Sequence, residues 1–215
     1  MDRPLTPMES LQQSCDDFDK LIRPVAEVKL DGRFDLVENM ADEMKRALDI
    51  EAGVDLWLVQ NAGGIRGVAS RVQRGKNWRT FTIRKERRTG VETEYAKRRD
   101  ALENELLYPA LTLHGYVTSD GVALLGFAVA QTRDLIAMIE QHQYDDVKMT
   151  REDRNDGIAT FYVIAWDNVC DGGYYFVEHD EPPTVVNTQA SRITAPPPQM
   201  SMFDDSERAR LIRRR

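Results

Sequence analysis

The stretch 122–130 contains eight apolar residues and one glycine. A strand that is apolar on both faces must be covered on both faces, so we expect this stretch in the middle of a sheet. It is too short to cross a membrane, because a spanning helix needs about 20 apolar residues. The chain is therefore predicted to be a soluble protein built around a sheet, with no membrane partner.

The spacing of apolar residues predicts the elements around this strand. Helical spacing predicts helices over 8–22, 35–49, 92–107 and 132–142. Asp35 would cap the second helix, with Glu38 completing a capping box, and Pro24 would end the first. Strands are predicted over 54–60, 65–73, 80–84, 110–118, 160–166 and 174–178. We predict a mixed α+β (α/β) fold, a central mixed sheet flanked by helices, in a single domain at 1–180.

The composition changes at residue 181. Pro182, Pro183 and the three prolines at 196–198 stand among Thr, Asn, Gln and Ser, and such a segment cannot bury enough apolar surface to fold. Residues 181–215 are therefore predicted to be a disordered, proline-rich C-terminal tail.

The net charge of −7 is unevenly distributed. Residues 66–99 contain twelve Lys or Arg and three Glu, a charge of +9, which leaves −16 for the rest of the chain. Trp78, Phe81 and Tyr95 lie among these cations, and cations with aromatic rings can bind phosphates and stack on bases. The alternative is a solvated face balanced by the acidic remainder. The candidate DNA contacts are Arg74, Lys76, Arg79, Arg84, Lys85, Arg87, Arg88 and Arg98.

The tail contains one short apolar motif. It reads Gln199, Met200, Ser201, Met202, Phe203, and apolar residues in a disordered segment favour docking into a pocket of a partner. The motif resembles the bacterial sliding-clamp-binding sequence Gln-Leu-Ser/Asp-Leu-Phe, with Met in place of both Leu residues. The resemblance implies that Gln199 is a hydrogen-bonding anchor and that Met202 and Phe203 fill the clamp pocket. The alternative is a short helix over 204–212 that packs Phe203 on the domain.

The order of elements over 35–118 is helix, three strands, helix, strand, and it resembles the αβββαβ core of PD-(D/E)XK nucleases. That resemblance implies an Asp near the second strand and Glu-x-Lys on the third, which together hold Mg²⁺ and orient water. Asp55 fits the first position, but the second reads Ala69-Ser70-Arg71. The candidate catalytic residues are Asp55, Glu94, Lys97 and Arg71, and the candidate metal ligands are Asp55, Glu38 and Glu94. Glu94 and Lys97 are otherwise an ordinary helix pair.

The remaining signals concern the compartment and other chemistries. Cys15 and Cys170 are expected to be unpaired thiols in a reducing cytoplasm, and the N-terminus lacks the pattern of a secretory signal. The three histidines do not have the mutual spacing of metal ligands, so we do not expect a zinc site. We expect a bacterial or phage protein of DNA metabolism that binds DNA and the sliding clamp, and that acts as a Mg²⁺-dependent nuclease if it is catalytic. The alternatives are a noncatalytic clamp ligand or inhibitor that blocks replication, and a protein whose basic segment binds another protein.

Overall fold

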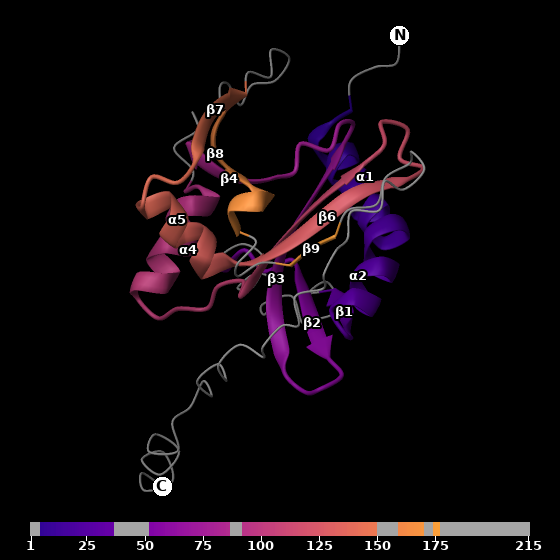
Figure 1. The fold of residues 1–215 in the computed structure, drawn as a ribbon, viewed down its shortest axis with the longest axis horizontal. Helices are drawn as coiled ribbons and strands as arrows, with labels where there is room; N and C mark the ends of the chain where they lie inside the picture. Colours follow the sequence, from indigo (N-terminus) through magenta and orange to yellow (C-terminus); the bar gives the residue numbers. More distant parts are fainter. Residues whose placement is uncertain (1–4, 37–51, 87–91, 150–158, 170–173, 177–215) are drawn as a thin grey trace, which may run out of the picture. The chain divides into compact units, whose positions relative to one another are not determined.

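The computed structural model describes residues 5–36, 52–86, 92–149, 159–169 and 174–176. Residue contacts divide the chain into two units, Met1–Pro182 and Pro183–Arg215, and every described residue lies in the first unit. The predicted tail, with its motif at 199–203, lies outside the described residues, as does Glu38. Figure 1 shows the described helices and strands as coloured ribbons.

A mixed sheet forms the centre of this unit. Its strands lie in the order β1-β2-β3-β5-β6-β9. Neighbouring strands pair antiparallel, except β3 and β5, which are parallel. The bounds are β1 Gly32–Leu36, β2 Leu56–Gln60, β3 Ile65–Arg74, β5 Leu111–Val117, β6 Leu124–Gln131 and β9 Tyr174–Phe176. The predicted mixed sheet is confirmed, and most of the apolar stretch 122–130 lies in β6, between β5 and β9.

A second sheet has the strand order β4-β8-β7. It contains β4 (Thr80–Glu86), β7 (Asp145–Met149) and β8 (Ala159–Ala165), all paired antiparallel. The strand predicted at 80–84, the third in the series over 35–118, is β4, and it pairs with β8 in this second sheet. The chain turns between the sheets through Gly75 and Arg79, whose φ angles are 112° and 52°. The apolar side chains Phe81 and Ile83 then pack on the face of the main sheet.

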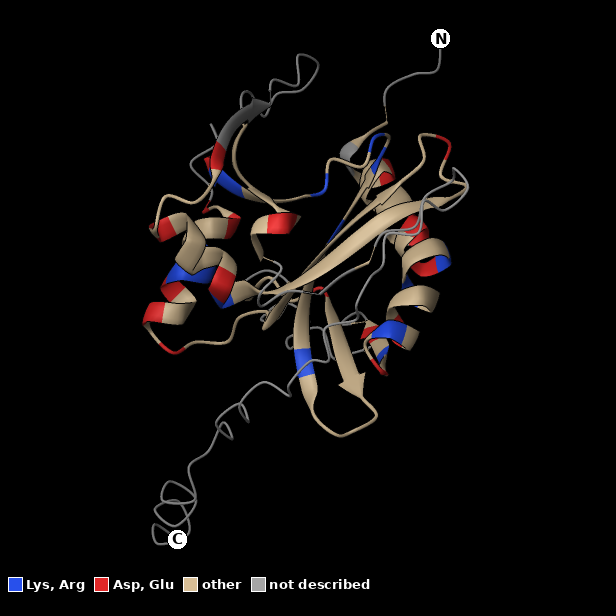
Figure 2. Cartoon of the chain, viewed as in Figure 1, with Lys and Arg blue, Asp and Glu red and all other residues tan. Residues whose placement is uncertain are grey.

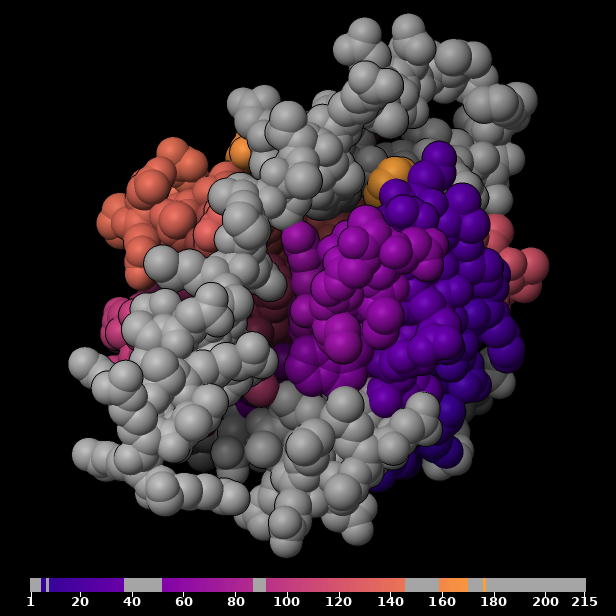
Figure 3. Space-filling view, turned by 90° about the horizontal axis from the view of Figure 1, so that it is seen from below, coloured from indigo at the N-terminus to yellow at the C-terminus, as the bar shows by residue number. Residues whose placement is uncertain are grey.

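Three consecutive helical segments cover one face of the main sheet: α1 (Pro7–Asp17), the π-helix η1 (Phe18–Ile22) and α2 (Arg23–Lys29). Thr6 and Glu9 form a capping box at the start of α1. Pro24 does not end the helix as predicted, because it lies in the first turn of α2, where a missing N–H costs nothing. Figure 3 shows this N-terminal part, in indigo, packed directly against the purple strands. Phe18 and Ile22 enter the same core as Phe127.

The second sheet, α4 (Glu94–Glu103) and α5 (Thr132–Glu140) contribute to a second core on the other face of the main sheet. Trp166, at the start of the short 3₁₀ helix η4 (Trp166–Val169), is one of the largest fully buried side chains there. Tyr116 of β5 packs on Trp166, with ring centroids 5.7 Å apart. The helix predicted over 92–107 is confirmed over Glu94–Glu103 only.

Two strands were not predicted, β1 and β7. Asp35 and Leu36 lie in β1, where Asp35 pairs with Trp57, so the predicted role of Asp35 as a helix cap is wrong. Residues 37–49 of that predicted helix lie outside the described residues. With β1 included, α2, β1, β2, β3, α4 and β5 follow one another in this order, but β4 of the second sheet lies between β3 and α4 in the chain. Asp55 then directly precedes the second strand of this series, and Arg71 lies on the third.

Candidate functional site

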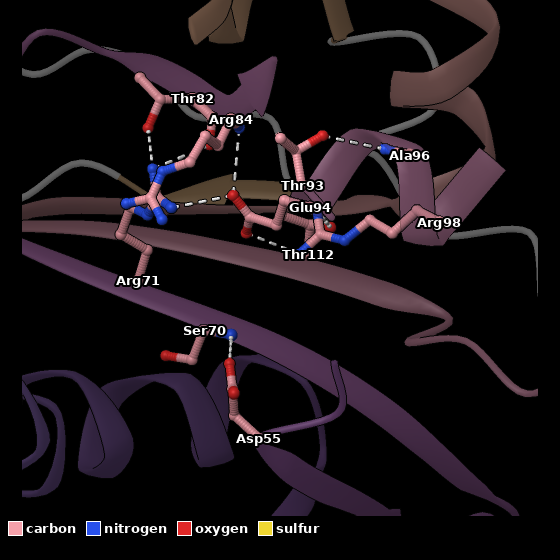
Figure 4. Close-up of polar contacts among 10 residues, drawn as sticks. All are labelled: Asp55, Ser70, Arg71, Thr82, Arg84, Thr93, Glu94, Ala96, Arg98 and Thr112. Atoms are coloured by element: carbon pink, nitrogen blue, oxygen red, sulfur yellow. Dashed lines mark hydrogen bonds and ion pairs between the residues drawn. The ribbon is translucent and has the colours of Figure 1, made fainter. Parts of the chain in front are cut away.

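Glu94, the first residue of α4, is the centre of a polar cluster between the two sheets (Figure 4). Thr93 caps the helix by accepting a hydrogen bond from the Ala96 amide, which fixes where Glu94 enters. Glu94 Oε2 accepts hydrogen bonds from Arg71 Nη2 at 2.9 Å and from the Arg84 amide at 3.2 Å. Its other oxygen, Oε1, accepts from Arg98 Nη2 at 3.0 Å. Both carboxylate oxygens are therefore engaged by cationic or amide donors.

Arg98 is buried, with 4% of its surface exposed. Its Nη1 donates to Thr112 Oγ1 at 3.4 Å, and Thr112 is hydrogen-bonded to Thr132 at 2.9 Å. A guanidinium held in this way cannot reach DNA, so the prediction that Arg98 contacts DNA is wrong. Arg98 instead connects α4 to β5 through Thr112.

Arg71 and Arg84 lie over the same aromatic ring. Their Cζ atoms are 5.5 Å and 5.4 Å from the centroid of Phe161 on β8. Arg71 Nη1 also donates to the Thr82 hydroxyl at 2.9 Å and to the Thr82 carbonyl at 3.3 Å. Arg84 Nε is buried and has no hydrogen-bond partner among the described residues. The site therefore holds two guanidiniums at the edge of the second core.

His114 lies beside Arg71, since the two residues are partners in the pairing of β5 with β3. Its ring stacks on Tyr116 with centroids 5.0 Å apart, and it is 1% exposed. Burial first, and the positive charge of Arg71 second, lower the pKa of His114 to about 3, while Glu94 acts in the opposite direction. The imidazole is therefore neutral at physiological pH.

The sequence reasoning did not identify His114, Thr82 or Phe161 as members of this site. The alternation of Thr112, His114 and Tyr116 along a strand is a signal that a polar set shares one face of β5. Thr82 shows a similar signal, since Thr80, Thr82 and Arg84 alternate with apolar residues along β4. Phe161 shows none, and the sequence does not reveal that its strand pairs with β4.

Asp55 does not join this cluster. It is exposed and precedes β2, and its Oδ2 accepts a hydrogen bond from the Ser70 amide at 2.7 Å. Figure 4 shows Asp55 on one side of β3 and Glu94 with its arginines on the other. The structure therefore does not bring Asp55 and Glu94 together as ligands of one metal.

The other candidates for catalysis give the metal no further support. Lys97 is half-buried on α4, and Arg71 is held by Glu94. Within the described ranges, no group of three or more His, Cys, Asp and Glu side chains is placed to hold a metal ion. Because Glu94 already binds two guanidiniums, the described residues do not fit a Mg²⁺ centre.

The residues predicted to contact DNA differ from one another in the partners that they have in the structure. Figure 2 shows Lys and Arg along β3 and the connection to β4, and both signs of charge on the helices. Arg74 Nε and Nη2 bind the Asp17 carboxylate at 2.6 and 2.7 Å, so Arg74 holds α1 to β3 rather than facing a ligand. Arg79 pairs with Asp167 at 2.8 Å, and Lys85 lies 5.0 Å from the Tyr162 ring centroid. Arg87 and Arg88 lie outside the described residues.

Lys76 and Trp78 are both exposed residues of the basic segment. They lie in the connection between β3 and β4, and the Lys76 ammonium is 4.6 Å from the Trp78 ring centroid. Trp78 is 62% exposed, which is unusual for so large an apolar ring. This pair presents a cation and a flat ring together at the surface.

No protein-family model, curated protein or solved structure matches this chain. In the part of the chain that the structure describes, no helix is long and apolar enough to cross a membrane.

Proposed function

We propose that this chain is a DNA-metabolism protein of a bacterium or phage, acting in the cytoplasm, that binds DNA through its basic segment and the sliding clamp through residues 199–203. The observation that carries the DNA part is the exposed pair of Lys76 and Trp78. The clamp part rests on the sequence of the tail.

The Lys76–Trp78 pair has the chemistry that single-stranded DNA binding requires. An exposed ring can stack on a base whatever its identity, a contact worth about 1–3 kcal/mol. The adjacent ammonium can neutralise a phosphate and release a counterion. Since Arg74, Arg79 and Arg98 are paired with carboxylates, we place the contact at this connection rather than along the whole basic segment.

The DNA proposal is tested by titrating a fluorescein-labelled oligonucleotide, single-stranded and duplex, with the full chain at several salt concentrations. Trp78→Ala should weaken binding about 5- to 150-fold, the equivalent of one lost stacking contact. Lys76→Ala should lower the slope of log K against log salt by about 0.7–0.9, the value for one phosphate contact.

The matched control is Lys29→Ala. Lys29 is also an exposed lysine over a ring, 5.6 Å from the Phe176 centroid, but it lies on α2 outside the basic segment. Its variant should bind DNA as the parent does. Equal affinities for the parent, Trp78→Ala and Lys76→Ala proteins would contradict the proposal.

The clamp proposal is tested with a purified bacterial sliding clamp and the full chain. Replacing Gln199, Met202 and Phe203 by Ala should abolish binding, because it removes the anchor and the apolar side chains that would fill the pocket. Leu211→Ala is the control, since it shortens an apolar side chain in the same tail outside the motif. Binding that survives the triple change, or that is lost with Leu211→Ala, would contradict the proposal.

Such a protein could be a Mg²⁺-dependent nuclease or a noncatalytic clamp ligand. We propose the noncatalytic clamp ligand, which would block replication by occupying the clamp. The observation in its favour is that Arg71 and Arg98 already engage both oxygens of Glu94. Incubation of linear, nicked and branched DNA with the protein and Mg²⁺ or Mn²⁺ should give no cleavage. Cleavage that disappears in Asp55→Ala would instead support the nuclease that the order of elements resembles.

A further inference from the structure

The polar cluster around Glu94 has an excess of positive charge. Arg71, Arg84 and Arg98 supply three guanidiniums and Glu94 one carboxylate, a net charge of two positive units from these four side chains. The Arg98 side chain is 4% exposed, Arg71 25% and Glu94 31%. Charges that are partly removed from water destabilise the protein unless they are balanced. A bound anion would balance this excess.

Hydrogen-bond donors remain for such an anion. Arg71 uses Nη1 for Thr82 and one N–H of Nη2 for Glu94, which leaves Nε–H and the second Nη2–H. The Nε of Arg84 is buried and has no hydrogen-bond partner among the described residues. Buried polar atoms nearly always have a hydrogen-bond partner, so an unpartnered buried donor points to a missing ligand.

The two guanidiniums are held in place by the ring that they share. Phe161 is 7% exposed, and both Arg71 and Arg84 lie within 5.5 Å of its centroid. Contact with the ring restricts both side chains and lowers the entropy lost on binding a ligand. A guanidinium offers a planar fork of donors that matches the oxygens of a phosphate. We infer that a phosphate group binds between Arg71 and Arg84, beside Phe161.

His114 lies next to the positive charge of Arg71. It is almost fully buried next to Arg71, and its Nε2 has no hydrogen-bond partner in the described part of the chain. Arg71 lowers the pKa of this imidazole by more than Glu94 raises it. The neighbourhood of Arg71 therefore disfavours additional positive charge and favours an anion.

The inference goes beyond the proposed function, because none of the site residues belongs to the Lys76–Trp78 pair or to the tail motif. The phosphate could come from a free nucleotide or from a DNA strand, and both would present the same tetrahedral oxygens. The test must therefore first establish the phosphate site and then identify the source.

Calorimetric titration of the full chain with inorganic phosphate, at ionic strength held constant with sodium chloride, tests the site. Arg84→Ala should weaken phosphate binding about ten- to a hundredfold, as expected for a lost charge-assisted hydrogen bond. Arg84→Lys keeps the positive charge but loses the planar fork of donors. Its affinity for phosphate should lie between those of the parent and of Arg84→Ala. Arg84 is a better choice than Arg71, because Arg71 also holds Thr82 and Glu94, whereas Arg84 Nε has no partner among the described residues.

Arg99→Ala is the control, since Arg99 also lies over a ring, 5.9 Å from the Tyr95 centroid, but makes its ion pair with Glu103. It should bind phosphate as the parent does. A parent protein that takes up no phosphate, or an Arg84→Ala variant that binds it equally well, would overturn the inference.

The source is identified by repeating the titration with a nucleoside monophosphate and with a duplex oligonucleotide that lacks terminal phosphates. If Arg84→Ala weakens duplex binding, the site binds a phosphate of the DNA backbone. If Arg84→Ala weakens only nucleotide binding, the site binds the phosphate of a free nucleotide. If neither depends on Arg84, the site is rejected. In that case DNA affinity that still depends on Trp78 leaves the proposed function standing.

Discussion

Arg74 and Asp17 form a two-point ion pair, with Nε to Oδ2 at 2.6 Å and Nη2 to Oδ1 at 2.7 Å. The Asp17 side chain is 5% exposed and lies at the end of α1, whereas Arg74 ends β3. The pair joins segments 57 residues apart. Arg74→Ala would leave a buried carboxylate without its cation.

Arg74→Ala should therefore destabilise the protein by about 3 kcal/mol, the lower end of the range for breaking a buried pair. Urea unfolding followed by circular dichroism measures this change. Arg33→Ala is the comparison, because Arg33 and Asp35 form an exposed pair at 2.8 Å, and exposed pairs contribute little to stability. Equal losses in both variants would show that the burial of Asp17 has no consequence.

His114 should make the protein sensitive to acid. Its folded-state pKa of about 3 lies below the ordinary 6.5, so between these values only the unfolded chain takes up the proton. The contribution of neutral His114 to the free energy of unfolding is complete above pH 6.5. It is lost as the pH falls toward 3, with a slope of up to about 1.4 kcal/mol per pH unit.

His114→Phe removes the titrating group and keeps a ring against Tyr116. Free energies of unfolding at pH 7, 6, 5 and 4 should fall less steeply in this variant than in the parent. Parallel curves would mean that His114 is protonated without cost in the folded protein.

Gly115 on β5 should not tolerate a side chain. A Cβ atom at this position would overlap Ile22 Cδ1 and approach Phe127 Cβ to 3.6 Å. Ile22 is fully buried, so Gly115→Ala should cost about 1–3 kcal/mol by overpacking.

Ile22→Val removes the overlapping methyl group and supplies the control. Alone it should cost about 0.5–1.5 kcal/mol, but combined with Gly115→Ala it should restore part of the lost stability. A double variant whose loss equals the sum of the two single losses would rule out the predicted overlap.

The neighbours Arg98 and Arg99 should differ strongly. Arg98 is buried between Glu94 and Thr112, whereas the Arg99 side chain is 50% exposed. Arg98→Ala should cost about 3 kcal/mol, whereas Arg99→Ala should leave the stability of the protein nearly unchanged. Thermal unfolding of the two variants decides the matter, since similar melting temperatures would contradict the buried role of Arg98.

The local elements followed from the sequence because their signals lie within a few neighbouring residues. Alternation predicted β3, β5 and β8, and helical spacing predicted α4 and α5, with errors at the ends. Pro24 was misread because a proline is tolerated in a first helical turn as well as after a last one. The strands β1 and β7 alternate polar and apolar residues over only four positions, 33–36 and 146–149, and were not predicted.

The candidate site was predicted only in part. Sequence reasoning selected Arg71, Arg84, Glu94 and Arg98, but it assigned them to catalysis, DNA or metal and did not connect them as one cluster. Arg71 and Glu94 are 23 residues apart in the sequence, and their contact depends on how the chain brings α4 back over β3. No local pattern records that path.

The sequence by itself determined a mixed α+β chain around an apolar strand, an excess of cations at 66–99, and a short apolar motif in a polar tail. Each follows from composition or from spacing along the chain. Only the tertiary structure decided that β4 joins a second sheet, that Asp17 is the partner of Arg74, and that Glu94 and Asp55 lie on different sides of β3. These relationships depend on which distant segments exclude water from each other, and burial of that kind is a property of the assembled fold.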